Sequence, residues 1–326
     1  MTRDVLCLRP EADFERADSL PPGSLGVIYR SPADIDVPQL MKEVRALVIP
    51  AVGPKLPPHL FDGTSVQFVQ VTGAGLDRLD LSLLKKLGVT AANVPGGSNN
   101  ALAEYAVTMA SALLRRFVWA DAEIRAGNYR EFRARMLIDN LAGLEDLTVG
   151  IIGLGVVGMA VAEAFYKRGC HILYYDSTPR DPQAAEAFNA ESVLLEELLA
   201  RADIITLHVP LLPSTEKLIG KRELSMMKTD AILIQSSRGG VVDEAALANC
   251  LNSGHLGGVA VDVYSTEPPD PADPLFALQG EAARRILFTP HIAGVTRQSA
   301  AFLFRCAWRN VARVLIEHQP PLHRVC

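Results

Sequence analysis

Short apolar runs alternate with longer helix-like stretches along this chain from residue 44 onward. The runs are rich in Val, Ile or Leu and are closely followed by Gly, Pro, Asp or Ser, a pattern typical of β-strands. The expected strands are Arg45–Ile49, Val66–Val71, Val149–Gly153, His171–Tyr175, Ile204–His208, Ala231–Gln235, Gly258–Asp262 and Ile286–Phe288. Helices are expected between them, among others at Met159–Arg168, Leu194–Arg201 and Glu244–Ser253. This order predicts an α/β protein with parallel sheets, and the continuous hydrophobicity of the strands predicts sheets covered on both faces.

A longer helix is predicted from about Asn100 to Ala126, where Ala, Leu, Val and Met recur at helical spacing. The next segment, Gly127–Leu147, is charged and irregular in pattern. We interpret this segment either as an excursion between domains or toward a partner subunit, or as an ordinary surface loop.

Composition narrows the possible functions. A chain of 326 residues suggests two domains, and 49% hydrophobic against 21% charged residues provides for real cores. The formal net charge of −5 argues against general electrostatic binding to nucleic acid or to an anionic membrane. The longest stretch without polar side chains, Val149–Ala162, is shorter than the ~20 residues of a membrane span. We therefore expect neither nucleic acid nor membrane as a partner.

The five cysteines are scattered and form no CxxC pair, so neither a metal site nor a disulfide framework is expected. The first residues lack the apolar segment of a secretory signal. Both features predict reduced thiols in a cytoplasmic protein.

A glycine motif provides the strongest local indication of a ligand. Gly153, Gly155 and Gly158 form GxGxxG directly after an apolar strand and at the start of an Ala-rich helix. This context is the one in which such glycines permit a tight turn, approach of backbone to a pyrophosphate and close packing of helix on strand. Asp176 follows the next strand, 18 residues after Gly158, where an acidic residue binds the ribose 2′-hydroxyl. NAD is therefore expected over NADP, although Arg180 would weaken that preference if it reached the ribose.

An acid or base and a cation are needed beside a nicotinamide, and the carboxyl ends of the strands offer three candidates. Arg238 follows the strand AILIQ, Glu267 lies in the turn DVYSTEPPD, and His291 follows the strand ILF. His208, at the end of the strand IITLH, is the only serious rival to His291 as the acid or base. The residues alone favour His291 but leave His208 open.

A series of ordered motifs resembles the D-isomer-specific 2-hydroxyacid dehydrogenase family, in particular the branch of 3-phosphoglycerate dehydrogenases and glyoxylate/hydroxypyruvate reductases. The resemblance covers essentially the whole chain from about Arg45. The motifs are VTGAGLDRLDL, NVPGG with ALAEYAV, VGIIGLGVVG, LHVPLLPST, MMKTDAILIQSSRGGVVDEAAL, GGVAVDVYSTEPP and FTPHIAGVT. Such a series in this order is far more specific than any single motif.

The resemblance implies roles for the three candidates. Arg238 would bind and polarise the 2-oxo acid, His291 would be the general acid/base, and Glu267 would hydrogen-bond His291. These roles agree with elementary chemistry, because a carboxylate favours the imidazolium form of a neighbouring histidine, and a guanidinium fork matches a carboxylate.

The resemblance also implies which residues bind the ligands. The backbone of Gly73, Ala74 and Gly75 would hold the substrate carboxylate together with Arg238 and His291, and Asp262 would fix the carboxamide or the adjacent ribose. The expected cofactor-binding set is Gly153, Gly155, Val156, Val157, Gly158, Asp176, Val209, Pro210, Ser236, Ser237, Asp262 and Gly294. Three positions depart from the family pattern without touching the proposed catalytic residues, namely Ser98, Gln235 and Ala293.

The family fold implies two Rossmann-like domains, each a doubly wound parallel sheet, with the nucleotide domain inserted into the substrate domain. Residues 1–98 and 298–326 would form the substrate domain, and 99–297 the NAD-binding domain with a dimerisation arm near 127–147. The predicted long helix and a helix near Gln298–Ile316 would be the crossings, and the active site would lie in the cleft. A homodimer is expected.

The expected activity is NAD-dependent reduction of a small 2-oxo acid to a D-2-hydroxy acid, with a glyoxylate/hydroxypyruvate-like or a 3-phosphoglycerate-like substrate. Lys55 is the only cation in the turn Pro50–Pro57, which weakly favours an unphosphorylated acid, while Arg130, Arg133 and Arg135 keep the question open. An NAD-sensing regulatory protein and a phosphite-type dehydrogenase are the alternatives. A formate-type enzyme is disfavoured, because such enzymes normally have Gln where Glu267 stands.

Overall fold

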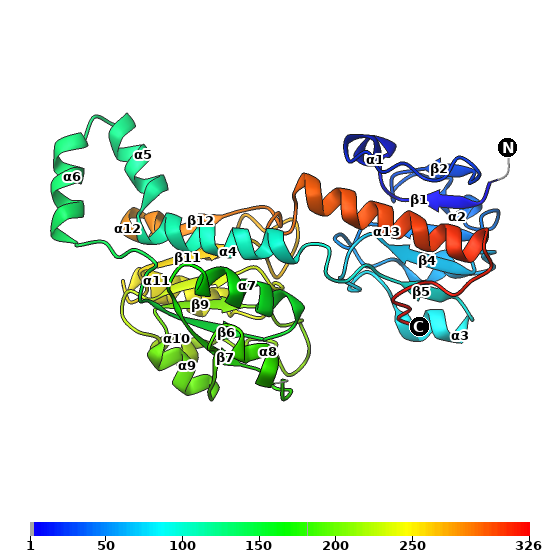
Figure 1. The fold of residues 1–326 in the computed structure, drawn as a ribbon. Coiled ribbons are helices and arrows are strands. Elements are labelled where there is room, and N and C mark those ends of the chain that lie inside the picture. Colours follow the sequence, from blue (N-terminus) through cyan, green and yellow to red (C-terminus); the bar gives the residue numbers. More distant parts are fainter. Residues whose placement is uncertain (1–2, 181) are drawn as a thin grey trace. The chain divides into compact units, whose positions relative to one another are not determined.

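The chain folds into two compact units in this computed structural model, which describes residues 3–180 and 182–326. One unit combines the chain up to Ser98 with Val295–Cys326, and the other is Asn99–Gly294. The second unit is thus an insertion into the first. Figure 1 shows the first unit in blue and cyan, with α13 in orange to red, and the second unit from turquoise through green and yellow to orange.

The first unit has a parallel sheet with the strand order β2-β1-β3-β4-β5. Its strands are β1 Val5–Cys7, β2 Val27–Tyr29, β3 Ala46–Ile49, β4 Phe68–Val71 and β5 Thr90–Ala92. Its helices are α1 Glu11–Arg16, α2 Val37–Leu40, the short 3₁₀ helix η1 Pro58–Phe61, α3 Leu81–Lys86 and α13 Arg297–Leu315.

Successive strand residues of this sheet enter two separate cores. Val5, Val48 and Phe68 pack with α1 and α13, whereas Leu6 and Leu47 face α2, η1 and α3. Side chains alternate between the faces of a strand, so a strand that is apolar at every position must be covered on both sides. The two-sided cover predicted from the sequence is confirmed.

The second unit has a parallel sheet with the order β12-β11-β10-β9-β6-β7-β8. Its strands are β6 Thr148–Ile152, β7 His171–Tyr175, β8 Glu191–Ser192, β9 Ile204–Leu207, β10 Ile232–Gln235, β11 Gly258–Val261 and β12 Ile286–Phe288. Its helices are α4 Asn99–Leu114, α5 Phe117–Arg125, α6 Tyr129–Ile138, α7 Val156–Tyr166, α8 Pro182–Glu186, α9 Leu195–Arg201, α10 Lys221–Met226, α11 Glu244–Asn252 and α12 Gly280–Arg284. One face packs on α4 and α7, and the other on α9, α10, α11 and α12.

The strands β1, β2, β5 and β8 were not predicted from the sequence. Each has three residues or fewer and so offers little length in which a hydrophobic pattern can stand out, although β12, with three residues, was predicted. All eight strands expected from the sequence are present, with boundaries that differ by two residues at most.

The prediction of one continuous helix from Asn100 to Ala126 is wrong. The helix breaks after α4, where Arg116 adopts a left-handed conformation with φ of +51°, and α5 then starts at Phe117. The Arg116 guanidinium pairs with Asp139 and lies 5.2 Å from the centre of the Trp119 ring. Asp139 is distant in sequence from the break, so the local spacing of apolar residues gave no indication of it.

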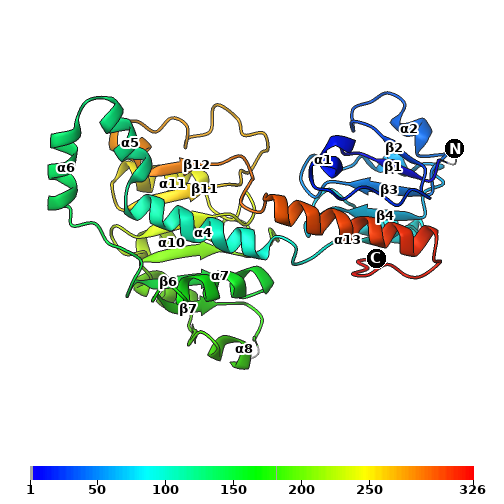
Figure 2. The same ribbon diagram turned by 45° about the horizontal axis from the view of Figure 1, so that its top comes forward.

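The segment Gly127–Leu147 is also more regular than predicted. It contains α6, of which only Phe132 is buried, with its ring 5.4 Å from that of Trp119. A charged helix with a single buried anchor has almost no apolar periodicity, which explains why the sequence pattern appeared irregular. Figures 1 and 2 both show α5 and α6 projecting from the sheet of the second unit.

Asn310 on α13 attaches the end of the chain to the first sheet. Its buried amide nitrogen donates to Gln70 Oε1 at 2.9 Å and to the Leu322 carbonyl at 3.0 Å, and its oxygen accepts from the Leu322 amide at 2.9 Å. Gln70 lies on β4 and is fully buried. The Asn310 side chain therefore satisfies partners on two segments, the inner strand β4 and the chain after α13.

We expect Asn310→Leu to lower the free energy of unfolding of the first unit by about 3 kcal/mol, because buried polar partners lose their hydrogen bonds. Urea unfolding followed by the fluorescence of Trp308 in a Trp119→Phe background measures this change. Asn249→Leu, on an exposed position of α11, is the matched control. Equal midpoints for the two variants would contradict the assigned role of Asn310.

Candidate active site

The turn between β6 and α7 can be built only with glycine at two positions. Gly153 has φ of +96°, and a Cβ there would lie 2.6 Å from the carbonyl oxygen of His208. A Cβ at Gly158 would lie 2.1 Å from the carbonyl oxygen of Gly153. The start of α7 therefore packs against the end of β6 so closely that no side chain fits at Gly153 or Gly158.

The start of α7 is open to a ligand. Gly155 is the N-cap residue, and a Cβ at this position would have no atom within 4 Å. Val156 and Val157 open the first turn, where backbone N–H groups have no partner within the helix. Free N–H groups, the positive end of the helix dipole and open space together fit the pyrophosphate of a dinucleotide.

Asp176 lies beside this turn at the end of β7. Its side chain is 7% exposed, and its Oδ2 accepts from the Leu154 amide and from Arg180, both at 2.8 Å. Its Oδ1 accepts from the Thr178 amide at 2.9 Å. The carboxylate is thus fixed next to the glycine turn, and Arg180 is held by it.

The remaining predicted cofactor positions follow along the same edge of the sheet. Val209 and Pro210 follow β9, and Val209 contacts the glycine turn, since a Cβ at Gly153 would lie 2.8 Å from its Cγ1. Ser236 and Ser237 follow β10, the neighbouring strand. The buried hydroxyl of Ser236 has no hydrogen-bond partner among the described residues. An unsatisfied buried hydroxyl at this edge fits a site that a bound ligand completes.

Asp262, at the end of β11, holds the loop that carries His291. Its carboxylate is fully buried and accepts from the Ile292 and Ala293 amides at 2.8 Å and from Thr289 Oγ1 at 2.6 Å. The His291 amide donates to the Asp262 carbonyl at 2.8 Å. The carboxylate therefore acts on this loop, and its predicted contact with the cofactor stays a prediction.

Two tyrosines, which the sequence did not single out, extend this network. Tyr105 on α4 hydrogen-bonds Thr289 Oγ1 at 2.7 Å, and Tyr264 donates to the Thr289 carbonyl at 2.9 Å. Burial raises the pKa of Tyr105, so this phenol stays protonated at neutral pH. Nothing in the local sequence indicates these contacts, because the partners are brought together only by the fold.

His291 and Glu267 are in direct contact. His291 Nδ1 lies 2.8 Å from Glu267 Oε2 and 3.1 Å from Oε1, and the two side chains are 24% and 28% exposed. Glu267 Oε1 also accepts from the Tyr264 amide at 3.2 Å. A carboxylate can only accept, so Nδ1 is the donor, and Nε2 remains for a substrate.

Arg238 follows β10 in a turn that lies against the Glu267 loop. A Cβ at Gly239 would lie 1.9 Å from the carbonyl oxygen of Tyr264, so only glycine permits this approach. Arg238 is half-buried and donates to the Ser237 carbonyl at 2.7 Å. Gln235 braces the turn by accepting from the Ser237 hydroxyl at 2.8 Å and donating to the Arg238 carbonyl at 2.9 Å. Arg238 therefore follows a strand at the same edge of the second sheet as the His291–Glu267 pair.

His208, the rival candidate, is in a different environment. Its Nε2 lies 2.9 Å from Thr206 Oγ1, and burial lowers its pKa to about 4. A ring with that pKa is uncharged at pH 7 and cannot provide the proton that a carbonyl reduction needs. His291 is thus the better acid/base candidate.

Gly73, Ala74 and Gly75 lie in the first unit, directly after β4. The Gly73 carbonyl accepts from the Val94 amide at 2.9 Å, and the Ala74 carbonyl accepts from Asn93 Nδ2 at 2.8 Å. The remaining predicted residue, Gly294, ends the second unit after the His291 loop.

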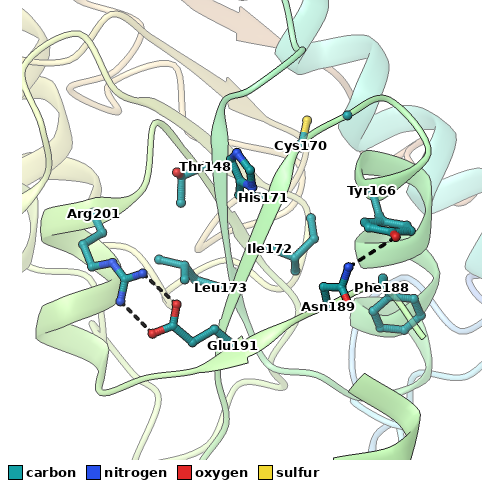
Figure 3. A pocket seen from close by; sticks show the side chains of 11 residues that line it. Thr148, Tyr166, Cys170, His171, Ile172, Leu173, Phe188, Asn189, Glu191 and Arg201 are labelled. Atoms are coloured by element: carbon teal, nitrogen blue, oxygen red, sulfur yellow. Dashed lines mark hydrogen bonds and ion pairs between the residues drawn. The ribbon is translucent and has the colours of Figure 1, made fainter. Parts of the chain in front are cut away.

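A cavity of about 550 Å³ lies at the opposite end of the second sheet, at the amino ends of β6 and β7. Figure 3 shows its ion pair between Arg201 and Glu191 and the hydrogen bond from Asn189 to Tyr166. Ligands of open parallel sheets bind at the carboxyl ends of strands, so this cavity is not the dinucleotide site.

Metal-binding clusters and membrane spans are both absent from the described parts of the chain. Residues 3–180 and 182–326 contain no group of three or more His, Cys, Asp or Glu side chains that could hold a metal ion. Among the same residues, no helix has both the length and the apolar character needed to cross a membrane.

Comparison with known proteins agrees with this geometry. Residues 107–293 match the family model for the NAD binding domain of D-isomer specific 2-hydroxyacid dehydrogenases. The chain is 34% identical to a glyoxylate reductase of Thermococcus litoralis over 284 residues, which are 86% of this chain and 83% of that protein. It is 34% identical to a D-3-phosphoglycerate dehydrogenase of Archaeoglobus fulgidus over 235 residues, which are 72% of this chain and 42% of that protein.

Solved structures extend the similarity to the whole fold. A protein from Thermus thermophilus is similar with a TM-score of 0.84 and 28% identity, covering 99% of this chain and 100% of that one. A D-lactate dehydrogenase from Treponema pallidum is similar with a TM-score of 0.81 and 26% identity, covering 99% of each chain. With the glycine turn and Asp176 fitting a dinucleotide, these matches show that the chain belongs to the D-isomer-specific 2-hydroxyacid dehydrogenases and is an NAD-dependent oxidoreductase.

Proposed function

We propose that this enzyme transfers a hydride between NADH and the C2 carbonyl of a small 2-oxo acid, giving a D-2-hydroxy acid. Glyoxylate and hydroxypyruvate are the proposed substrates, and the D configuration applies to the product of hydroxypyruvate, since C2 of glycolate is not a stereocentre. The observation that carries the proposal is the 2.8 Å contact of His291 with Glu267 on a loop fixed by Asp262. The similarity to proteins named glyoxylate reductase supports the choice of substrate.

In the proposed mechanism, the bound nicotinamide supplies the hydride that the C2 carbon accepts. Arg238 binds the carboxylate and polarises the carbonyl, which favours accumulation of charge on the carbonyl oxygen. His291 Nε2 donates a proton to that oxygen, and Glu267 stabilises the protonated ring beforehand. The carbonyl thus gains one hydride at carbon and one proton at oxygen, and the reverse steps oxidise the hydroxy acid.

We expect His291→Gln to lower kcat for glyoxylate reduction by roughly 10²–10⁴, the usual contribution of a general acid. Arg238→Met should lower kcat/KM by roughly 10²–10³, because the carbonyl loses its charged donor. Stopped-flow or steady-state NADH oxidation measures both changes, and NADH fluorescence titration verifies that cofactor binding persists. His171→Gln, an exposed histidine at the amino end of β7, is the control. Near-normal turnover in either variant would refute the assigned role.

Cofactor choice is proposed to depend on Asp176. We expect Asp176→Ser to increase the ratio of kcat/KM for NADPH to that for NADH at least about tenfold, because the carboxylate that repels a 2′-phosphate is lost and Arg180 is released. Asp203→Ser, at the amino end of β9, is the matched control. An unchanged ratio in Asp176→Ser would show that other residues select the cofactor.

We also propose that α5 and α6 form the contact of a homodimer. They expose apolar side chains to an unusual extent, with Leu137 at 65% and Ile138 at 82%. The helices are nevertheless anchored, since Glu123 pairs with Arg284 at 2.9 Å and the Arg135 guanidinium lies 4.5 Å from the Trp119 ring centre. An anchored projection with an apolar outer face fits a surface that a second copy covers.

The double substitution Leu137→Glu and Ile138→Glu should convert the dimer to a monomer, because burying two carboxylates in an apolar contact is costly. Sedimentation velocity at micromolar concentration measures the mass. Leu194→Glu changes a similarly exposed leucine elsewhere in the second unit and should leave the dimer intact. A monomeric wild type, or a dimeric double variant, would exclude this interface.

A further inference from the structure

Arg78 is a buried cation without an acidic partner. It lies in the turn after β4 and is 3% exposed. Its Nε donates to the Pro54 carbonyl at 2.9 Å and its Nη1 to the Pro50 carbonyl at 3.1 Å. Within residues 3–180 and 182–326 no carboxylate forms an ion pair with it. Burial lowers the pKa of Arg78, yet a guanidinium remains protonated at neutral pH, so the charge persists.

Two backbone donors in the preceding turn are also without partners. The carbonyls of Gly73 and Ala74 are both directed to the end of β5, where Val94 and Asn93 donate to them. A trans peptide directs its N–H opposite to its C=O. The N–H groups of Ala74 and Gly75 therefore point away from β5, and neither donates a hydrogen bond within the described parts of the chain.

One five-residue loop, residues 50–54, contacts both the Arg78 guanidinium and the turn that begins at Gly73. A Cβ at Gly73 would lie 2.7 Å from the Ala51 Cβ, so the loop packs directly on the turn. A Cβ at Gly53 would lie 3.3 Å from Arg78 Nε, and the guanidinium also binds the carbonyls of Pro50 and Pro54. The buried charge and the two free N–H groups are thus linked through a single short loop.

We propose that Arg78 is the fixed counter-charge of a carboxylate site formed by the N–H groups of Ala74 and Gly75. The inference rests on the proposed function and adds Arg78 to the turn at which the substrate carboxylate is expected to bind. A buried charge is costly unless an opposite charge offsets it, and an anionic ligand provides that charge. In the described parts of the chain the Arg78 guanidinium donates to the Pro50 and Pro54 carbonyls, so we assign it as a positioning residue: it orders the loop and raises the affinity for the anion.

This arrangement changes the interpretation of the turn Pro50–Pro57. Lys55 is the only cation within the sequence of this turn. Arg78 comes 24 residues after Pro54 in the chain, but it donates to the Pro54 carbonyl and so brings a second cation to the turn. Both protein partners of its guanidinium are carbonyls, so the field of Arg78 acts on any carboxylate bound at the turn, whatever the rest of the acid. We therefore expect its effect on KM to be similar for glyoxylate, hydroxypyruvate and pyruvate.

The test compares wild type with Arg78→Met, Arg78→Lys and Arg45→Met. Arg45 is the matched control, because it is also partly buried and donates to a backbone carbonyl, that of Leu315, but at the amino end of β3. We expect Arg78→Met to raise the KM for glyoxylate about tenfold with kcat within about twofold, Arg78→Lys to lie between, and Arg45→Met to resemble wild type. NADH affinity should be unchanged in all four proteins.

Calorimetric titration with oxalate, a small dicarboxylate, provides a readout independent of turnover. Weaker oxalate binding to Arg78→Met than to Arg45→Met supports the inference even if wild type reduces no 2-oxo acid, an outcome that would defeat only the proposed function. Equal oxalate affinity and equal KM in Arg78→Met and Arg45→Met would overturn the inference. So would failure of wild type to bind oxalate. If Arg78→Met does not fold, Arg78→Lys decides, since an unchanged KM and oxalate affinity there would exclude a role for the guanidinium fork.

Discussion

The buried carboxylate of Asp262 is the interaction on which the arrangement of the active site depends. A carboxylate removed from water must receive hydrogen bonds, and this one receives them from Thr289, Ile292 and Ala293. Those donors all lie in the loop that carries His291, so satisfying the charge also fixes the loop. His291 adopts a left-handed φ of +55°, a conformation that persists only where the surroundings determine it. The contact with Glu267 follows from that fixed backbone.

Parallel strands explain how residues far apart in sequence meet at this edge. The turns after β10, β11 and β12 carry Arg238, Asp262 and His291, and these strands are neighbours in the sheet. The close approach of Gly239 to Tyr264 then joins the first turn to the loop of Glu267. Each turn provides one group, and the order of the strands determines which groups become neighbours.

The sequence predicts those features that depend on local pattern. Most strand positions in the second sheet and the glycine turn follow from spacing and residue type, which also favour His291 but leave His208 open. Other features depend on partners that no local pattern identifies. The break at Arg116 depends on Asp139 and Trp119, the order of α6 depends on one buried phenylalanine, and the position of Arg78 beneath the 50–54 loop depends on the packing of two turns. Tertiary contacts decided each of these.

Asp262 and Arg78 each carry a buried charge that must be stabilised, but the consequence differs between the two residues. Asp262 receives three hydrogen bonds within its own unit, which stabilise its negative charge without neutralising it, and the charge serves structure. Arg78 makes two side-chain hydrogen bonds, fewer than its five N–H groups could make, so its buried positive charge is stabilised less completely. An internally satisfied anion rigidifies a loop, whereas a cation left uncompensated creates a field that an external anion can neutralise. The first arrangement suits an acid/base group that must not move, and the second suits a site that binds and releases a carboxylate.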